Sequence, residues 1–286
     1  MIAQITLTVN EGKQLIALAV ANLPKVRRAI KSGKILLKGG TTVSAIAEEL
    51  VGIPLRISGR ISPLGAKSAR MAITEPHSIL IDNGVPIGVD DRLEQAVLGM
   101  GPDDVAICGA NLIDSSGRAA MMAGSALGGK PGRIVSALAA EGIAVIIPAG
   151  LEKLTPGSVP EAILAARRKG VAWSMGMATG LIPIPGRVIT ELTAFSLLAP
   201  VTATVIGRGG IMGAEGATTF VIQGEKAKVQ KICRLILKLK RAAVSGAKGS
   251  IEECRPGSAG CDSHLGCVYA GKEKIKLEGI FEADDE

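Results

Sequence analysis

Aromatic side chains are nearly absent from this chain: Phe, Trp and Tyr make up 2% of its 286 residues, with Trp173 and Tyr269 each the single residue of its kind. The core must therefore be aliphatic, and an RNA-binding surface of stacked aromatic rings is excluded. Long apolar runs are missing too, since none reaches the roughly 18 residues that span a bilayer. The first ten residues lack the basic-then-apolar order of a signal peptide. We expect a soluble cytoplasmic protein with neither membrane nor nucleic acid as a partner.

Apolar residues are abundant, at 47% against 21% charged, which is enough to bury a substantial core. The net charge of +7 indicates a mild attraction to anions. The length suits one large α/β domain or two ordinary domains. Whether the chain forms a homo-oligomer is left open by the sequence.

Short apolar segments alternate with helical patterns through the first half of the chain, as at 34–38, 78–81, 105–113 and 143–147. This alternation predicts an α/β fold: an open, mostly parallel sheet with helices on both faces and ligands at the carboxyl ends of its strands. We expect this sheet domain over residues 1–154. A smaller α+β, ferredoxin-like subdomain is expected over 155–245, followed by an irregular Cys/His-containing tail over 246–286.

The first candidate site is the turn formed by Gly39, Gly40, Thr41 and Thr42, which follows an apolar strand and opens a helix. Glycine lets a backbone approach an anion closely, threonine hydroxyls donate hydrogen bonds, and the helix start contributes its dipole. The pattern predicts a phosphate-binding turn. An ordinary strand-to-helix turn is the alternative.

A glycine-rich loop over 207–216 joins two β-rich segments and includes Arg208, Gly209 and Gly210. Its glycines allow close approach to a ligand, and Arg208 could bind a phosphate or carboxylate through two N–H groups of its guanidinium. The alternative is a long flexible hairpin loop.

Residues 105–154 carry short glycine motifs that include Gly109-Ala110-Asn111 at a strand end, Gly117, Gly124 and Gly128-Gly129. This stretch resembles the superfamily of ribose-5-phosphate isomerase A, the CoA-transferases, the sugar-sensing domains of DeoR-type repressors and methylthioribose-1-phosphate isomerase. The resemblance implies that Gly109 and Asn111 line a ligand site. It also implies that the turn at Gly39 is the early phosphate turn of that superfamily.

One departure from the family pattern bears on activity. Ribose-5-phosphate isomerase carries Asp-Gly-Ala-Asp where this chain has Cys108-Gly109-Ala110-Asn111, and its catalytic Lys and Glu have no counterpart here. Moving a proton between sugar carbons needs a positioned carboxylate, so this isomerase activity is disfavoured. Asp114 and Cys108 remain as catalytic candidates, with a turn aspartate and an inert core thiol as the alternatives. His77, beside Pro76, is interpreted as structural.

The tail concentrates soft ligands: Cys254, Cys261, His264 and Cys267 lie within fourteen residues. Three thiols and an imidazole separated by glycines suit a zinc ion or an iron–sulfur cluster. Free or disulfide-paired thiols are the alternative.

The sequence therefore predicts binding or conversion of a phosphorylated or other anionic small molecule at the carboxyl ends of the strands. One alternative is a metabolite sensor or regulator of the same fold without turnover. The other is a metal-dependent or iron–sulfur protein that acts through the C-terminal cysteines and histidine.

Overall fold

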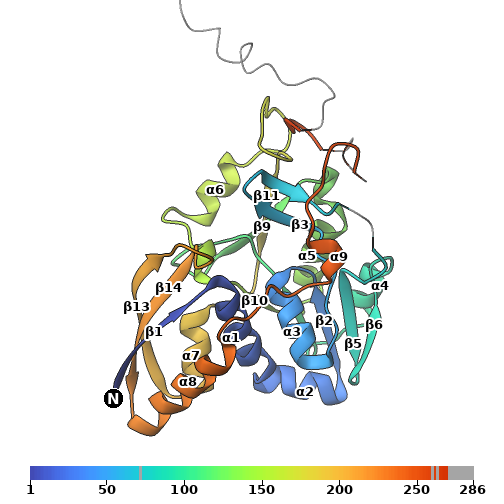
Figure 1. Ribbon diagram of the computed structural model, residues 1–286. Helices are drawn as coiled ribbons and strands as arrows, with labels where there is room; N and C mark the ends of the chain where they lie inside the picture. The colour runs from blue at the N-terminus through green and yellow to red at the C-terminus, as the bar shows by residue number, and fades with distance from the viewer. Residues whose placement is uncertain (71–72, 259–260, 262–263, 270–286) are drawn as a thin grey trace, which may run out of the picture.

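The computed structural model describes residues 1–70, 73–258, 261 and 264–269. It is a mixed α/β structure with a six-stranded sheet at its centre (Figure 1). The strands of this sheet follow the order β12-β10-β7-β2-β5-β6. Their bounds are β2 Lys34–Lys38, β5 Ser78–Asp82, β6 Val85–Gly88, β7 Val105–Cys108, β10 Ala144–Pro148 and β12 Arg187–Ile189.

The sheet is mixed, whereas the sequence predicted a mostly parallel one. Strands β12, β10, β7 and β2 are parallel neighbours, and β5 and β6 add two antiparallel pairings at one side. The pairing of β5 with β6 follows from the turn between them, where Asn83 and Gly84 both have positive φ. Such a turn closes a hairpin and leaves no room for a crossover helix.

The sheet is buried on both faces because β2 and β7 are aliphatic throughout their middle. Ile35 and Leu37 of β2 share one hydrophobic cluster with helices α1 (Val9–Ala21) and α3 (Thr41–Val51). Leu36 points the other way and joins a second cluster with α4 (Leu93–Leu98) and α5 (Gly129–Ala140). Helix α2 (Pro24–Ser32) connects α1 to β2.

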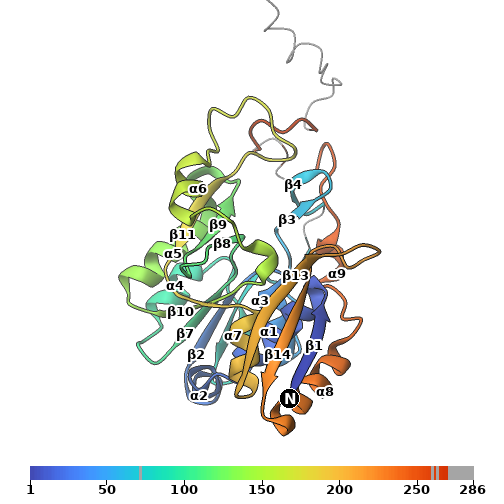
Figure 2. The same cartoon turned by 90° about the vertical axis from the view of Figure 1, so that its left-hand side faces the viewer.

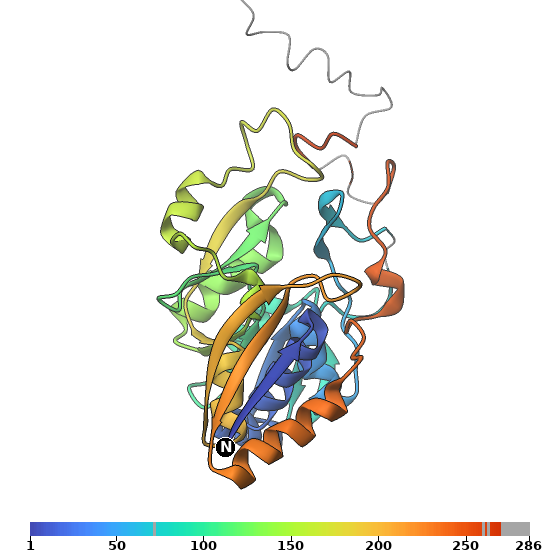
Figure 3. The ribbon, with the colours of Figure 1, turned by 60° about the vertical axis from the view of Figure 1, so that its left-hand side comes forward.

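A second, antiparallel sheet has the order β1-β14-β13, with β1 at Ile2–Leu7, β13 at Val201–Gly209 and β14 at Ala217–Gly224 (Figure 3). Helices α7 (Glu191–Leu198) and α8 (Lys226–Leu239) pack with it. Phe195 and Phe220 meet edge to face, with ring centroids 5.2 Å apart. The basic helix α8 buries Val229, Ile232 and Ile236, as its apolar spacing requires.

Shorter elements lie beyond the carboxyl ends of the parallel strands (Figure 2). Strands β8, β9 and β11 form a small sheet, and β3 and β4 form a hairpin. Their bounds are β3 Gly59–Ser62, β4 Gly65–Ser68, β8 Leu112–Ile113, β9 Ala119–Ala123 and β11 Gly180–Ile184. The remaining helices are η1 Ala126–Gly128, η2 Leu151–Lys153, α6 Val159–Ala165 and α9 Lys248–Ile251.

The predicted division at residue 154 stays a prediction, and three strand pairings cross it. Strand β1 pairs with β14, β12 pairs with β10, and β11 pairs with β9. Side chains of both sheets also share the cluster that contains α1. Within the described residues, no helix is long and apolar enough to cross a membrane. Part of the predicted tail, residues 270–286 included, lies outside the described residues.

Candidate functional site

Strand β2 ends at Lys38, and two glycines turn the chain into α3. Gly40 has φ of 130°, a conformation that favours glycine. A Cβ on Gly39 would lie 2.0 Å from Cε1 of His77, so the ring of His77 occupies the space beside this turn. The Gly39 N–H also donates to the His77 carbonyl at 2.9 Å. The predicted anion turn is therefore held in place by His77, which immediately precedes β5.

The Lys38 side chain is 4% exposed. Its Nζ lies 3.3 Å from the sulfur of Met121 on β9, and Lys38 makes no ion pair within the described part of the chain. Burial lowers the pKa of this ammonium, while the neighbouring Cys108 opposes the shift. A thioether is a weak acceptor, so the charge of Lys38 is poorly compensated.

The first turn of α3 begins three residues after this lysine and offers free donors. No side chain caps the helix, and the buried hydroxyl of Thr42 has no hydrogen-bond partner among the described residues. Uncapped N–H groups at a helix start attract anions.

His77 has a defined protonation state. Its Nδ1 lies 2.9 Å from the Arg56 carbonyl oxygen and 2.9 Å from the Ser58 hydroxyl. Because a carbonyl oxygen accepts only, the neutral ring carries its proton on Nδ1. Burial lowers the pKa of His77 to about 4, so the imidazole is neutral at physiological pH. From the sequence His77 is interpreted as structural, and no local pattern connects it with the turn at Gly39.

Gly109 and Asn111, the residues expected to bind a ligand at the end of β7, lie in different surroundings. Gly109 meets the turn, since a Cβ on it would lie 3.6 Å from the Gly39 carbonyl oxygen. Asn111 instead accepts a hydrogen bond from the Met122 N–H at 3.0 Å.

Asp114 and Cys108, the two catalytic candidates from the sequence, both lie in surroundings that are typical of residues with a structural role. Asp114 accepts hydrogen bonds from the N–H groups of Ser116, Arg118 and Val159 and from the Arg118 guanidinium, which hold its pKa below the ordinary value. The Cys108 thiol is fully buried, and burial raises its pKa. A nucleophilic cysteine needs the opposite shift.

The glycine-rich loop lies over η2 and not over β2. The Arg208 guanidinium donates to the Leu151 carbonyl. Gly209 and Gly210 have positive φ, and a Cβ on Gly210 would lie 1.8 Å from the Ala214 carbonyl oxygen. These glycines are therefore required by the hairpin itself.

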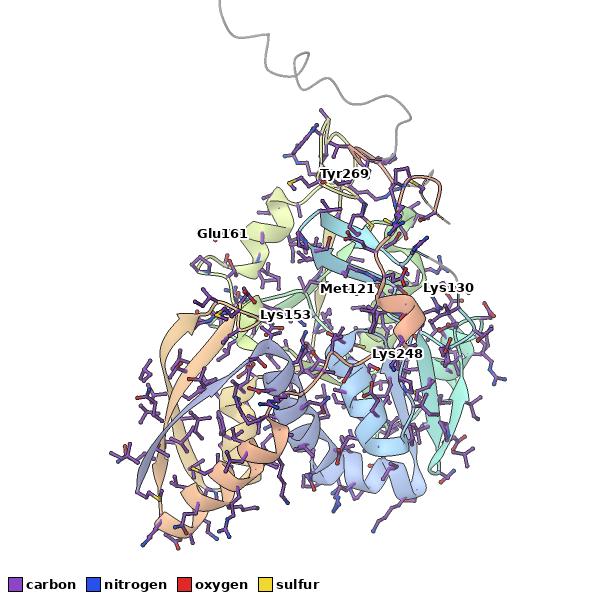
Figure 4. All side chains as sticks on the ribbon, in the orientation of Figure 1. Met121, Lys130, Lys153, Glu161, Lys248 and Tyr269 are labelled. Atoms are coloured by element: carbon purple, nitrogen blue, oxygen red, sulfur yellow. The ribbon has the colours of Figure 1, made fainter. Side chains whose placement is uncertain are left out.

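Four charged side chains that the sequence analysis did not single out gather near Arg208, at the ends of β10 and β12. They are Lys13, Glu152, Lys153 and Glu191, and their charges influence one another. Figure 4 labels Met121 on β9 and Lys153 on η2, which lie between α1 and α3 on one side and β11 and α6 on the other. Both Glu152 and Glu191 follow the end of a parallel strand, which is the signal that could have found them.

The structure does not assemble the predicted metal site. In the residues that it describes, no group of three or more His, Cys, Asp and Glu side chains could hold a metal ion. The Cys254 backbone N–H donates a hydrogen bond to the carbonyl of Ser68 on β4. Cys267 forms an isolated backbone β-bridge with Ser174. Burial lowers the pKa of His264, and the positive charges of Arg168 and Lys67 lower it further. A site formed by Cys254, Cys261, His264 and Cys267 stays a prediction.

No family model matches this chain, and no curated protein or solved structure matches it either.

Proposed function

We propose that the edge of the sheet around Lys38 and the start of α3 binds the anionic group of a small molecule, with a phosphate ester as the best match. The observation that carries the proposal is the buried ammonium of Lys38, which faces a methionine sulfur where a carboxylate would be expected. Burying an unpaired charge is costly, and a bound anion would offset that cost.

Two further features support an anion at this place. The uncapped first turn of α3 contributes its N–H groups and the positive end of its dipole. The buried Thr42 hydroxyl lacks a partner within the described residues and can donate one more hydrogen bond. The resemblance of the glycine motifs to sugar-phosphate-binding proteins agrees with this assignment.

Calorimetric titration with inorganic phosphate and with fructose 6-phosphate tests the proposal. Lys38→Met keeps the length and burial of the side chain, and we expect it to lose at least about tenfold in affinity, the value of one charged hydrogen bond. Thr42→Val should lose about fivefold. Gly40 is a poorer target because its φ of 130° makes any substitution strain the turn.

Lys31→Met is the matched control, since Lys31 is an exposed lysine on α2. It removes the same charge and should leave affinity unchanged. Equal binding by the wild type and Lys38→Met would refute the proposal.

Sensing without turnover is the second candidate function. It is favoured by Asp114, whose carboxylate oxygens are both engaged in structural hydrogen bonds, and by Cys108, which burial keeps as a thiol. A ligand that binds through Lys38 and is recovered unchanged after prolonged incubation would support sensing. Conversion of the bound ligand would support an enzyme.

A further inference from the structure

The ends of β10 and β12 bring together side chains from three distant parts of the sequence. Pro148 and Ile189 are paired neighbours at the ends of these parallel strands. The chain then enters η2 with Glu152 and Lys153 after β10, and α7 with Glu191 after β12. Lys13 reaches the same place from the first turns of α1.

Lys13 and Lys153 are half-buried ammonium groups without a bonded partner. Neither makes a hydrogen bond or an ion pair within the residues that the structure describes. Burial lowers the pKa of both, and the charge of Lys13 lowers that of Lys153 further. Two ammonium groups that repel each other away from water are stabilised by an anion between them.

Glu191 is too firmly held to neutralise these lysines by direct contact. Its side chain is 4% exposed, and its Oε2 accepts a hydrogen bond from the Leu151 N–H at 2.9 Å. Its Oε1 lies against two glycines, since a Cβ on Gly12 would be 2.5 Å away and one on Gly150 3.0 Å away. The carboxyl group is therefore packed in place, out of ion-pair distance from either lysine.

The single carboxylate of Glu152 does not neutralise the positively charged side chains around it. Its carboxylate has one buried oxygen without a hydrogen-bond partner in the described chain, and its other oxygen lies 2.0 Å from the position of a Cβ on Gly150. Burial and this neighbouring carboxylate raise the pKa of Glu191 to about 7. Below pH 7, where Glu191 is mostly protonated, Lys13, Lys153 and Arg208 face the single charge of Glu152.

We propose that Lys13 and Lys153 form a second anion subsite, which binds a second anionic group of the ligand held at Lys38. This inference rests on the proposed function. Strand β10 is separated from β2 by β7 alone, so both subsites lie along the carboxyl ends of the same parallel strands. The ligand class is then a small molecule with an anionic group at each end, such as a hexose bisphosphate or a phosphorylated sugar acid.

Two matched pairs of probes test this inference by calorimetry at low salt and pH 7. Fructose 1,6-bisphosphate is compared with fructose 6-phosphate, and 6-phosphogluconate with glucose 6-phosphate. We expect the doubly anionic member of a pair to bind at least about tenfold more tightly to the wild type. The first pair tests a phosphate and the second a carboxylate in the second subsite.

The variants separate the two proposals. Lys153→Met and Lys13→Met should remove the preference for the doubly anionic probe and leave monophosphate binding unchanged. Lys38→Met should weaken both members of each pair, and the control Lys31→Met should change neither. Melting temperatures without ligand verify folding, and Lys153→Gln replaces Lys153→Met if the latter does not fold.

The pH dependence of the preference for 6-phosphogluconate over glucose 6-phosphate gives a separate readout. The carboxylate of 6-phosphogluconate is ionised throughout the range used, so a change in preference comes from the protein. This preference should shrink between pH 6 and pH 8 as Glu191 ionises, and should stay constant in Glu191→Gln.

Each outcome decides one of the two proposals. Equal affinity for both members of each pair, with monophosphate binding that still depends on Lys38, would overturn the second subsite alone. A preference that persists in both Lys153→Met and Lys13→Met would also overturn it. Absence of any Lys38-dependent binding would overturn the proposed function, and the second subsite with it.

Discussion

The two ends of the parallel part of the sheet, at β2 and at β10 with β12, leave lysines without carboxylate partners in different ways. At β2, Lys38 is buried among uncharged groups, with Met121 and Cys108 as its neighbours. At β10 and β12, Lys13 and Lys153 lie near Glu152 and Glu191, which stay out of ion-pair distance. The comparison teaches that an anion-binding charge can be kept available by apolar burial or by fixing the neighbouring acids. The first end has no acidic neighbour, and the second has in Glu191 a carboxyl group whose charge changes near pH 7.

The largest expected effect concerns Glu191. Its pKa of about 7 lies above its ordinary value of 4.5, so the unfolded chain ionises between these values while the folded chain keeps its proton. Folding stability therefore falls as pH rises through this window and stays lower above it. Glu191→Gln keeps an acceptor for the Leu151 N–H and should raise the free energy of unfolding at pH 8 by about 3 kcal/mol, with no gain at pH 4.

Urea denaturation from pH 4 to pH 8 measures this difference. The exposed Glu49 on α3 supplies the control Glu49→Gln, which should follow the wild type. Parallel stability curves for Glu191→Gln and the wild type would show that burial does not hold the proton on Glu191.

Lys38→Met should stabilise the protein without ligand. The change removes a desolvated ammonium and leaves an apolar side chain of similar length, so we expect the free energy of unfolding at pH 7 to rise by about 1–3 kcal/mol. The same experiment on exposed Lys31→Met should give a change within about 0.5 kcal/mol. A loss of stability in Lys38→Met would mean that the ammonium already has adequate partners in the folded protein.

His77 should give a change of similar size and of the opposite sign to that of Glu191. Its pKa of about 4 lies below the ordinary 6.5, so the unfolded chain binds a proton between these values and the folded chain does not. This contribution is lost as pH falls through the window, and it partly offsets that of Glu191. The chain has two histidines, so NMR titration of their ring protons resolves His77 directly. A titration midpoint near 6.5 would contradict the neutral, buried ring.

The smallest effect on the sheet edge is expected from the C-terminal cysteines. If Cys254, Cys261, His264 and Cys267 form the predicted site, protein purified without oxygen contains about one zinc per chain or shows iron–sulfur absorbance. Cys261→Ser should then lose the metal, and Cys233→Ser, on α8, should retain it. Neither variant should alter phosphate binding at Lys38. Metal-free wild-type protein would leave these residues as thiols and an imidazole.

Local patterns explain which parts of the fold and site were predictable from the sequence. The turn from β2 into α3 was predictable because strand, glycines and helix are consecutive residues. The antiparallel placement of β5 beside β2 was not, because it depends on a pairing between Lys38 and Ser78 that no local pattern encodes. Lys13, Glu152 and Glu191 were missed for the same reason. Each resembles an ordinary surface charge until the fold buries it beside the others.

The pairing of β1 with β14 has a consequence for how the chain folds. Ile2 lies opposite Gln223, so the edge strand β1 cannot pair until more than two hundred further residues have been synthesised. At ribosomal rates of about 5–20 residues per second, that wait is on the order of ten seconds or more. Such non-local pairing slows folding, and it leaves the backbone of β1 open to other strands during synthesis. Newly made chains should therefore be most prone to aggregate before β14 emerges.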